Sequence, residues 1–266
     1  MIETLPIWSA TGSKDPLDNP RLFFIPRDDQ PRPVVLVLPG GGYGHLAPHE
    51  GRPIARALMK HGFHGAVLHY RLGPRHHHPA MLNDVQRAIR LLRANAVRWR
   101  IQGDSHGQAL VGVMGFSAGG HLTSTIACHF DRFTAPQDDL APRYSARPDA
   151  VGLCYPVVDL AGQFRHHGSM VNLLGENPDE GMVTKLSNHL EVRPDSPPAF
   201  LWHTADDGAV PVQNSLWYFQ ACLKQQVRAE MHIYESGQHG LGLSPKLPNI
   251  RTWANLCGLF MQRHLR

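Results

Sequence analysis

The chain alternates short apolar runs with stretches of helical periodicity. The apolar runs are rich in β-branched or aromatic residues and lack a polar–apolar alternation, which is typical of strands covered on both faces. There are six of them: Val34–Leu38, Gly65–Tyr70, Leu110–Met114, Ala150–Tyr155, Ala199–His203 and Glu230–Tyr234. We therefore predict a mostly parallel sheet whose two faces are both buried.

Helical patterns fall between these runs. The clearest covers Met81–Trp99, where apolar residues recur with the 3.6-residue period of a helix. Weaker patterns cover Glu50–His61, which Gly62 ends, and residues 214–226 and 249–264. Strands that alternate with helices predict an α/β fold with helices on both faces of the sheet.

Two segments depart from this alternation. Leu5–Trp8 and Arg21–Ile25 are typical of short strands around a turn rich in Gly, Asp, Asn and Pro, and they predict an antiparallel edge. Residues 156–198 have little periodicity and are long for a connection, so we expect a cap or lid with short helical pieces. Since no linker divides the chain, we predict that residues 1–266 form a single domain.

The third apolar run leads directly into Gly115-Phe-Ser117-Ala-Gly119, and a helix-compatible segment follows. A G-x-S-x-G motif between a strand and a helix is typical of a nucleophile elbow, which raises the Ser117 hydroxyl clear of the sheet. The N-terminus of the helix then offers N–H groups to a developing anion. The motif alone is also compatible with an ordinary glycine-rich turn.

A serine hydroxyl becomes a good nucleophile only when a histidine base, oriented by a carboxylate, removes its proton. His239 lies on the loop after the last predicted strand, in Gly237-Gln-His-Gly240. Asp207 lies on the loop after the preceding strand, three residues before Val210. We predict Asp207 as the orienting acid on this spacing, with Asp206 as its rival; either carboxylate could instead cap the following helix.

A glycine-rich loop, Leu38-Pro-Gly-Gly-Gly-Tyr43, follows the first core strand. Glycines allow the backbone to approach a substrate oxygen closely, so we predict that Gly41, Gly42 and Ala118 donate N–H groups to an oxyanion. A phosphate-binding loop is a weaker interpretation, because G-K-[ST] and the complete dinucleotide-binding pattern are absent.

Other polar and aromatic residues are weaker candidates. Tyr43, which leaves the glycine loop, together with His45 and Trp217, is a candidate for lining an acyl or sugar pocket. Asp84 is placed on the polar face of the long helix and is expected to be structural.

The order Ser117…Asp207…His239 and the surrounding motifs resemble the α/β-hydrolase superfamily over essentially the whole chain. Pro39-Gly-Gly-Gly-Tyr43 looks like the esterase/lipase branch that carries P-G-G-G-Y where hormone-sensitive-lipase-like enzymes carry H-G-G-G. That branch includes predicted acetyl-xylan esterases and other carbohydrate acetyl esterases. Further similarity lies in Tyr70–Gly73, His78–Asp84, Asn172–Gly175 and Pro198–Thr204.

The resemblance implies an α/β-hydrolase fold with a mostly parallel sheet of about eight strands and a small cap. It implies a serine carboxylic-ester hydrolase that forms an acyl-enzyme and needs neither a metal nor an organic cofactor. Short-acyl esters, above all acetyl esters, are the implied substrates, and acetylated sugars such as xylo-oligosaccharides are candidates among them. Two alternatives stay open: a formamidase or peptidase-like amide hydrolase, and a hydrolase fold used only for binding, which would predict a broken triad.

Composition narrows the function classes. Of the 266 residues 42% are hydrophobic and 18% charged, which is typical of a globular protein. The net charge of +4 is small and no dense Lys/Arg cluster occurs, which argues against nucleic-acid binding. No apolar run approaches the roughly 20 residues that span a bilayer, and no signal peptide is recognisable, so we expect a cytoplasmic protein. A homo-oligomer is compatible with the sequence.

Histidines and cysteines are the remaining candidates for metal or redox chemistry. His76–His78 and the pair His166-His167 suggest a metal, but adjacent histidines point in different directions and no acidic or thiol partners have ligand spacing. We expect solvated loop histidines and no metal. The four cysteines form no C-x-x-C and are expected to be buried thiols.

Overall fold

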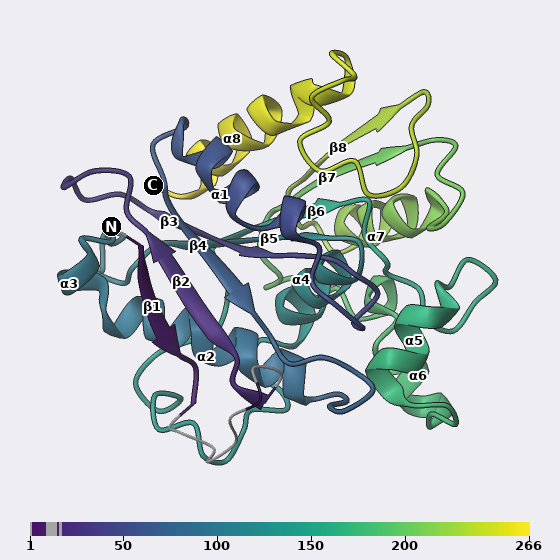
Figure 1. Cartoon of the computed structure of the whole chain (residues 1–266), viewed down its shortest axis with the longest axis horizontal. Coiled ribbons are helices and arrows are strands. Elements are labelled where there is room, and N and C mark those ends of the chain that lie inside the picture. The colour runs from purple at the N-terminus through teal and green to yellow at the C-terminus, as the bar shows by residue number, and fades with distance from the viewer. Residues whose placement is uncertain (1, 9–14, 16–17) are drawn as a thin grey trace.

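The computed structural model describes residues 2–8, 15 and 18–266. Within them one eight-stranded sheet runs in the order β1-β2-β4-β3-β5-β6-β7-β8 (Figure 1). The strands are β1 (Glu3–Pro6), β2 (Arg21–Ile25), β3 (Val34–Leu38), β4 (His64–His69), β5 (Val111–Phe116), β6 (Ala150–Cys154), β7 (Ala199–Thr204) and β8 (Ala229–Tyr234). β1 and β2 form the antiparallel edge, and the other strands are parallel to one another.

The helices cover both faces of this sheet, as predicted (Figure 1). The α-helices are α1 (Arg52–Met59), α2 (Ala80–Ala94), α3 (Ala96–Trp99), α4 (Ala118–His129), α5 (His167–Leu174), α6 (Glu180–Lys185), α7 (Gln213–Lys224) and α8 (Trp253–His264). Short 3₁₀ turns are η2 (Pro48–Glu50), η3 (Asn188–Leu190) and η4 (Ile250–Thr252). The sheet with its two helical layers is an α/β-hydrolase architecture.

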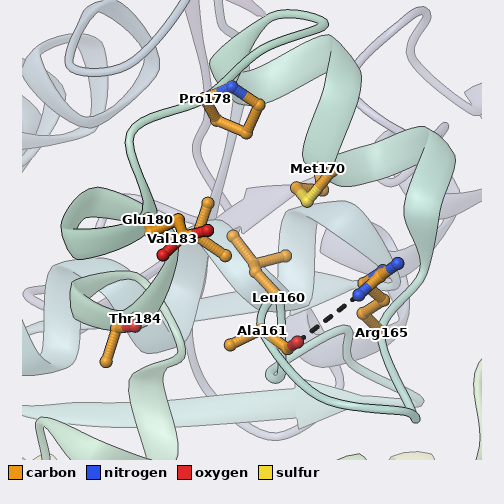
Figure 2. A pocket seen from close by; sticks show the side chains of 8 residues that line it. All are labelled: Leu160, Ala161, Arg165, Met170, Pro178, Glu180, Val183 and Thr184. Carbon is orange, nitrogen blue, oxygen red and sulfur yellow. Dashed lines mark hydrogen bonds between the residues drawn. The ribbon is translucent and has the colours of Figure 1, made fainter.

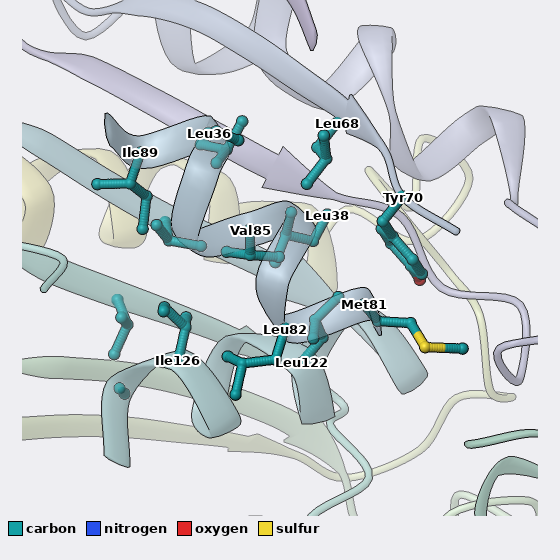
Figure 3. Close-up of a cluster of buried hydrophobic side chains, with 14 of the residues drawn as sticks. Leu36, Leu38, Leu68, Tyr70, Met81, Leu82, Val85, Ile89, Leu122 and Ile126 are labelled. Atoms are coloured by element: carbon teal, nitrogen blue, oxygen red, sulfur yellow. The ribbon is translucent and has the colours of Figure 1, made fainter. Parts of the chain in front are cut away.

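The side chains of each buried strand divide between two apolar cores. On one face Leu36 and Leu38 pack with α2 and α4, as Figure 3 shows. On the other face Val35 and Val37 pack with α1 and α8. All four cysteines are buried and unpaired, as expected for thiols that serve as small apolar groups. Burial on both faces explains why these strands contain no polar alternation.

Several predicted boundaries differ from the structure. The long helix is interrupted at Asn95, whose backbone has φ −99° and ψ 14°, and the Leu91 carbonyl accepts from both the backbone N–H and the side-chain amide of Asn95. The segment predicted as Glu50–His61 is divided by Gly51 into η2 and α1. β1 ends two residues before Trp8, and the predicted turn that follows lies partly outside the described residues, at 9–14 and 16–17.

The interpretation of Asp84 as a residue of a polar helix face is wrong. Its side chain is fully buried. Its carboxylate accepts hydrogen bonds from the Trp8 indole at 2.6 Å and from the Arg71 guanidinium at 2.7 Å. A buried carboxylate is tolerated when charged and neutral donors saturate it, so Asp84 is a structural link between α2 and the chain that leaves β4.

The parallel strands all end at one edge of the sheet. The loop after β3 contains Gly41, the turn after β5 contains Ser117, and the loops after β7 and β8 contain Asp207 and His239. Polar residues at this edge come from distant parts of the sequence because parallel strands bring their carboxyl ends together. In the described part of the chain no helix has the length and hydropathy to cross a membrane.

Candidate active site

Ser117 occupies a strained turn between β5 and α4. Its backbone has φ 52° and ψ −118°, a conformation that costs a non-glycine residue about 1–3 kcal/mol. The flanking glycines are required by close packing, since a Cβ on Gly115 would lie 2.0 Å from the Gly119 carbonyl oxygen. A Cβ on Gly119 would lie 2.2 Å from the Leu38 carbonyl oxygen. The turn is therefore held by neighbouring backbone, which is the geometry of a nucleophile elbow.

A continuous hydrogen-bonded chain joins three of the predicted residues. Ser117 Oγ lies 2.8 Å from His239 Nε2, and His239 Nδ1 lies 2.6 Å from Asp207 Oδ2. A carboxylate can only accept, so Nδ1 carries the proton and Nε2 is free to accept from the serine hydroxyl. The arrangement can therefore move the Ser117 proton onto His239 while Asp207 holds the ring.

Asp207 is held in place by several donors. Its Oδ1 accepts from the N–H groups of Ala209 and Val210, both at 2.9 Å, and the side chain is fully buried. Burial by itself raises the pKa of Asp207, but hydrogen bonds from His203, His239 and Val210 outweigh it and hold the pKa well below its ordinary value. The group is thus a carboxylate over the whole range in which His239 could act as a base.

The rival carboxylate Asp206 has other partners. It accepts from the Ser236 hydroxyl at 2.6 Å and from the Gly237 N–H at 2.7 Å, on the loop that leads to His239. The structure thus brings Asp207 to the histidine and uses Asp206 to brace the histidine loop.

The glycine loop has three successive N–H groups with different surroundings. The Gly40 N–H donates to Glu50 Oε2 at 2.8 Å and is therefore occupied. No described residue accepts from the N–H groups of Gly41, Gly42 or Ala118. Gly41 and Gly42 have φ of 123° and 62°, which favour glycine and turn their N–H groups out of the ordinary strand path. These three unpaired donors are the ones predicted for an oxyanion.

Tyr43 does not offer its hydroxyl to an open pocket. Its side chain is fully buried, and its hydroxyl oxygen lies 2.8 Å from His121 Nδ1. His121 Nε2 donates to the Leu186 carbonyl, so Nδ1 accepts and the Tyr43 hydroxyl donates. Tyr43 therefore anchors the glycine loop to α4 and, through His121 and the Leu186 carbonyl, to the segment predicted as a cap.

The contacts of the other two pocket candidates, His45 and Trp217, are with residues other than Ser117. His45 is exposed, and its backbone N–H closes the glycine loop onto the Gly41 carbonyl at 3.2 Å. Trp217, on α7, packs its ring against Phe164 and His189, each at 5.1 Å. Trp217 thus contacts the segment predicted as a cap, and its role in substrate binding stays a prediction.

Residues 156–198 fold into α5, α6 and η3, the short helical pieces expected of this segment. Asn172 on α5 donates to the Gly42 carbonyl at 2.9 Å, so the segment directly supports the glycine loop. Between α5 and α6 lies a cavity of about 430 Å³, shown in Figure 2. Its lining residues are Leu160, Ala161, Arg165, Met170, Pro178, Glu180, Val183 and Thr184.

The histidine clusters have separate partners. His76 lies 2.8 Å from Asp18, His77 bonds the Asn172 carbonyl, and His166 Nδ1 accepts from the Ser169 N–H. His78 is not a solvated histidine, because it packs against Phe133 and burial lowers its pKa to about 4. Among the described residues no group of three or more His, Cys, Asp or Glu is arranged to hold a metal ion.

Two residues that sequence patterns did not single out are Glu50 and Tyr155. Glu50 is 2% exposed and bonds both the glycine loop and the Tyr155 hydroxyl. Tyr155 packs its ring against His239 at 5.0 Å. Neither residue belongs to a motif. The one signal in the sequence that could have drawn attention to Glu50 is its position as a charged residue directly ahead of an amphipathic helix.

The fold and this site together define a hydrolase of the α/β-hydrolase superfamily with its polar residues at the strand ends. A family model supports this, since BD-FAE matches residues 22–221. The chain therefore belongs to the BD-FAE family, within an esterase branch of the superfamily.

Curated relatives and solved structures agree with this placement. The chain is 37% identical to endo-1,4-beta-xylanase B of Butyrivibrio fibrisolvens over 84% of its length and 34% of the relative. It is 34% identical to an acetylxylan esterase of Xylanibacter ruminicola over 82% of its length and 43% of the relative. The chain thus spans less than half the length of both relatives.

A solved structure covers nearly all of the chain. An acetyl ester-xyloside bifunctional hydrolase from Caldicellulosiruptor lactoaceticus is 42% identical with a TM-score of 0.88, over 98% of this chain and 96% of that one. A carboxylesterase from Lactobacillus plantarum is 27% identical with a TM-score of 0.79, over 99% and 97% of the two chains.

Proposed function

We propose that the protein is a serine carboxylic-ester hydrolase. The observation that carries this proposal is the unbroken chain from Ser117 Oγ through His239 to Asp207, with bonds of 2.8 and 2.6 Å. Such a chain supplies a nucleophile, a base and an orienting carboxylate in the order that acyl transfer needs. The family membership favours an ester as the acyl donor.

The reaction follows from these positions in two halves. His239 takes the proton of Ser117 as the serine oxygen attacks the ester carbonyl, and the N–H groups of Gly41, Gly42 and Ala118 receive the oxyanion. His239 then protonates the alcohol oxygen as its bond to the carbonyl carbon breaks. The alcohol leaves, and the acyl group stays on Ser117. A water molecule, deprotonated by His239, releases the acid and restores the serine hydroxyl.

We infer that short acyl groups, acetyl above all, and acetylated sugars such as xylo-oligosaccharides are the substrates. Relatives that are named an acetylxylan esterase and an acetyl ester-xyloside hydrolase favour this class. The hydrogen bond from Asn172 to the Gly42 carbonyl also supports this proposal, because the segment predicted as a cap then lies close enough to the glycine loop to limit the size of the acyl group.

The decisive assay compares p-nitrophenyl acetate with longer acyl esters and with acetylated xylo-oligosaccharides. We expect the acetyl esters to be preferred and Ser117→Ala to abolish hydrolysis, since loss of a catalytic serine costs on the order of 10⁶ in kcat. His167→Ala, at an exposed position on α5, is the matched control and should retain full activity. Hydrolysis that persists in Ser117→Ala would overturn the mechanism, and faster cleavage of N-formylkynurenine would favour a formamidase.

A further inference from the structure

A buried carboxylate outside the proposed triad joins the two loops that carry its chemistry. Glu50, the last residue of η2, is 2% exposed, and its carboxylate accepts hydrogen bonds from two uncharged donors, while His49 Nε2 lies 3.6 Å from Oε1. Burying a carboxylate costs several kcal/mol unless donors saturate it. The donors that hydrogen-bond to Glu50 therefore indicate which parts of the site this carboxylate holds in place.

The first donor belongs to the glycine loop. Glu50 Oε2 accepts from the Gly40 N–H at 2.8 Å. A Cβ on Gly40 would lie 2.7 Å from Glu50 Oε2 and 3.0 Å from Ser117 Cβ, so Gly40 is packed between the carboxylate and the nucleophile. Fixing the Gly40 N–H toward Glu50 sets the plane of its peptide, and the following N–H groups of Gly41 and Gly42 remain for the oxyanion.

The second donor leads to the histidine loop. The Tyr155 hydroxyl donates to Glu50 Oε1 at 2.6 Å and accepts from the Gly242 N–H at 2.8 Å. The hydrogen bonds run in one direction along this path. The Gly242 N–H donates to the Tyr155 oxygen, the Tyr155 hydroxyl donates to Glu50, and the carboxylate only accepts. The Tyr155 ring packs edge-on against the His239 ring, with centroids 5.0 Å apart.

A neighbour on η2 strengthens the same link. His49 Nε2 lies 2.9 Å from the Gly240 carbonyl, directly after His239. A Cβ on Gly242 would lie 2.9 Å from the His49 ring, so the histidine loop rests against η2. One short turn thus contacts both the oxyanion loop and the base loop.

We propose that Glu50 is a positioning residue that, together with Tyr155, fixes the Gly41 and Gly42 N–H groups relative to His239 during acyl transfer. The inference rests on the proposed esterase function. Glu50 is buried, and its hydrogen bonds join it to Gly40 and Tyr155 and not to Ser117, so it acts through these two residues. Its effect belongs to the transition state, in which the oxyanion forms, and not to binding of the neutral ester.

The test uses Glu50→Ala, Glu50→Gln and Tyr155→Phe in the full chain. We expect Glu50→Ala to lower kcat about 10- to 100-fold with KM changed less than about threefold, because a displaced oxyanion donor weakens mainly the transition state. Tyr155→Phe should lower kcat less. The double variant Glu50→Ala/Tyr155→Phe should lose less than the product of the two single effects, since both act on one path.

A second readout separates positioning from stability. A thionoester, whose sulfur is a poor acceptor, probes the oxyanion donors directly. We expect the ratio of kcat/KM for the oxygen ester over the thionoester to fall in Glu50→Ala and to recover partly in Glu50→Gln, whose amide oxygen can still accept from the Gly40 N–H. Asp138→Asn is the matched control, because this buried carboxylate accepts from Arg87 and Arg90 away from the site. It should lower stability and leave the ratio unchanged.

The outcomes are distinguishable. In a first outcome, activity depends on Ser117, but folded Glu50→Ala and Glu50→Gln keep the wild-type kcat and the wild-type ratio of oxygen ester to thionoester. This outcome would overturn the positioning role of Glu50 and leave the proposed esterase function intact. Activity that survives Ser117→Ala would overturn the proposed function and this inference with it. An equal change in the ratio in Asp138→Asn would reduce the effect to general destabilisation and would also overturn the positioning role.

Discussion

At the scale of single residues, Asp206 and Asp207 show how adjacent carboxylates acquire different tasks. Asp207 is turned inward, accepts from Ala209 and Val210, and meets His239 at 2.6 Å. Asp206 is turned to the loop before His239 and accepts from Ser236 and Gly237. Spacing in the sequence favoured Asp207, but only the geometry separates the two, because neighbours on a loop can exchange places with a small change in backbone direction.

We expect Asp207→Asn to lower kcat by about 10⁴-fold. An asparagine amide would donate toward Nδ1, and His239 would then carry its proton on Nε2, where it can no longer accept from Ser117. Steady-state kinetics with p-nitrophenyl acetate measure this. Asp206→Asn is the matched control and should change kcat by less than about threefold; equal losses in both variants would contradict the assignment of Asp207.

At the scale of elements, α5 shows how the segment 156–198, predicted as a cap, contacts loops at the end of the sheet. Asn172 bonds Gly42, and the Asn172 carbonyl accepts from His77. A Cβ on Gly73 would lie 2.1 Å from the Asn172 carbonyl oxygen, so the helix is closely packed against the loop after β4. The sequence predicted short helices in residues 156–198 from composition alone. It could not predict the contact, because no periodic pattern encodes which loop a cap helix meets.

We expect Asn172→Ala to lower kcat about 5- to 20-fold, because the Gly42 carbonyl loses the donor that fixes the Gly42–Tyr43 peptide, directly next to the Gly42 N–H. KM for p-nitrophenyl acetate should change less. His167→Ala, on the same helix but exposed, provides the control for general effects on α5. A normal kcat in Asn172→Ala would show that the glycine loop holds its own conformation.

At the scale of the whole molecule, the mostly parallel sheet, its antiparallel edge and the burial of both sheet faces were accessible from the sequence, whereas the order of the strands came from the structure. Unbroken apolar runs such as Val34–Leu38, rich in β-branched residues, are typical of strands covered on both sides, and the β5–α4 turn is encoded by glycines that backbone contacts require. The interior polar groups were not accessible. Asp84, Glu50 and His121 look like surface residues in a pattern of polar and apolar positions, and long-range partners alone explain why they are buried.

Buried histidines of this kind make the stability of the molecule sensitive to mild acid. Burial lowers the pKa of His121 to about 4, and burial together with His121 and His129 lowers the pKa of His78 to about 4. The unfolded chain binds protons near the ordinary pKa of about 6.5, and the folded protein does not until about pH 4. Between these values the unfolded state holds more protons, so the free energy of unfolding falls as pH decreases, by about 1.4 kcal/mol per pH unit for each such histidine.

We therefore expect urea-unfolding midpoints to decrease steadily from pH 6.5 to pH 5, a window above the titration of most carboxylates. His121→Gln should reduce the slope of the unfolding free energy against pH by up to the contribution of one proton, about 1.4 kcal/mol per pH unit. A glutamine can accept from Tyr43 and donate to the Leu186 carbonyl without titrating. The variant would be less stable than the wild type near pH 7 and would approach it as pH falls. An unchanged slope in His121→Gln would mean that this histidine is already protonated in the folded protein. The Tyr43–His121–Leu186 link would then carry a buried charge.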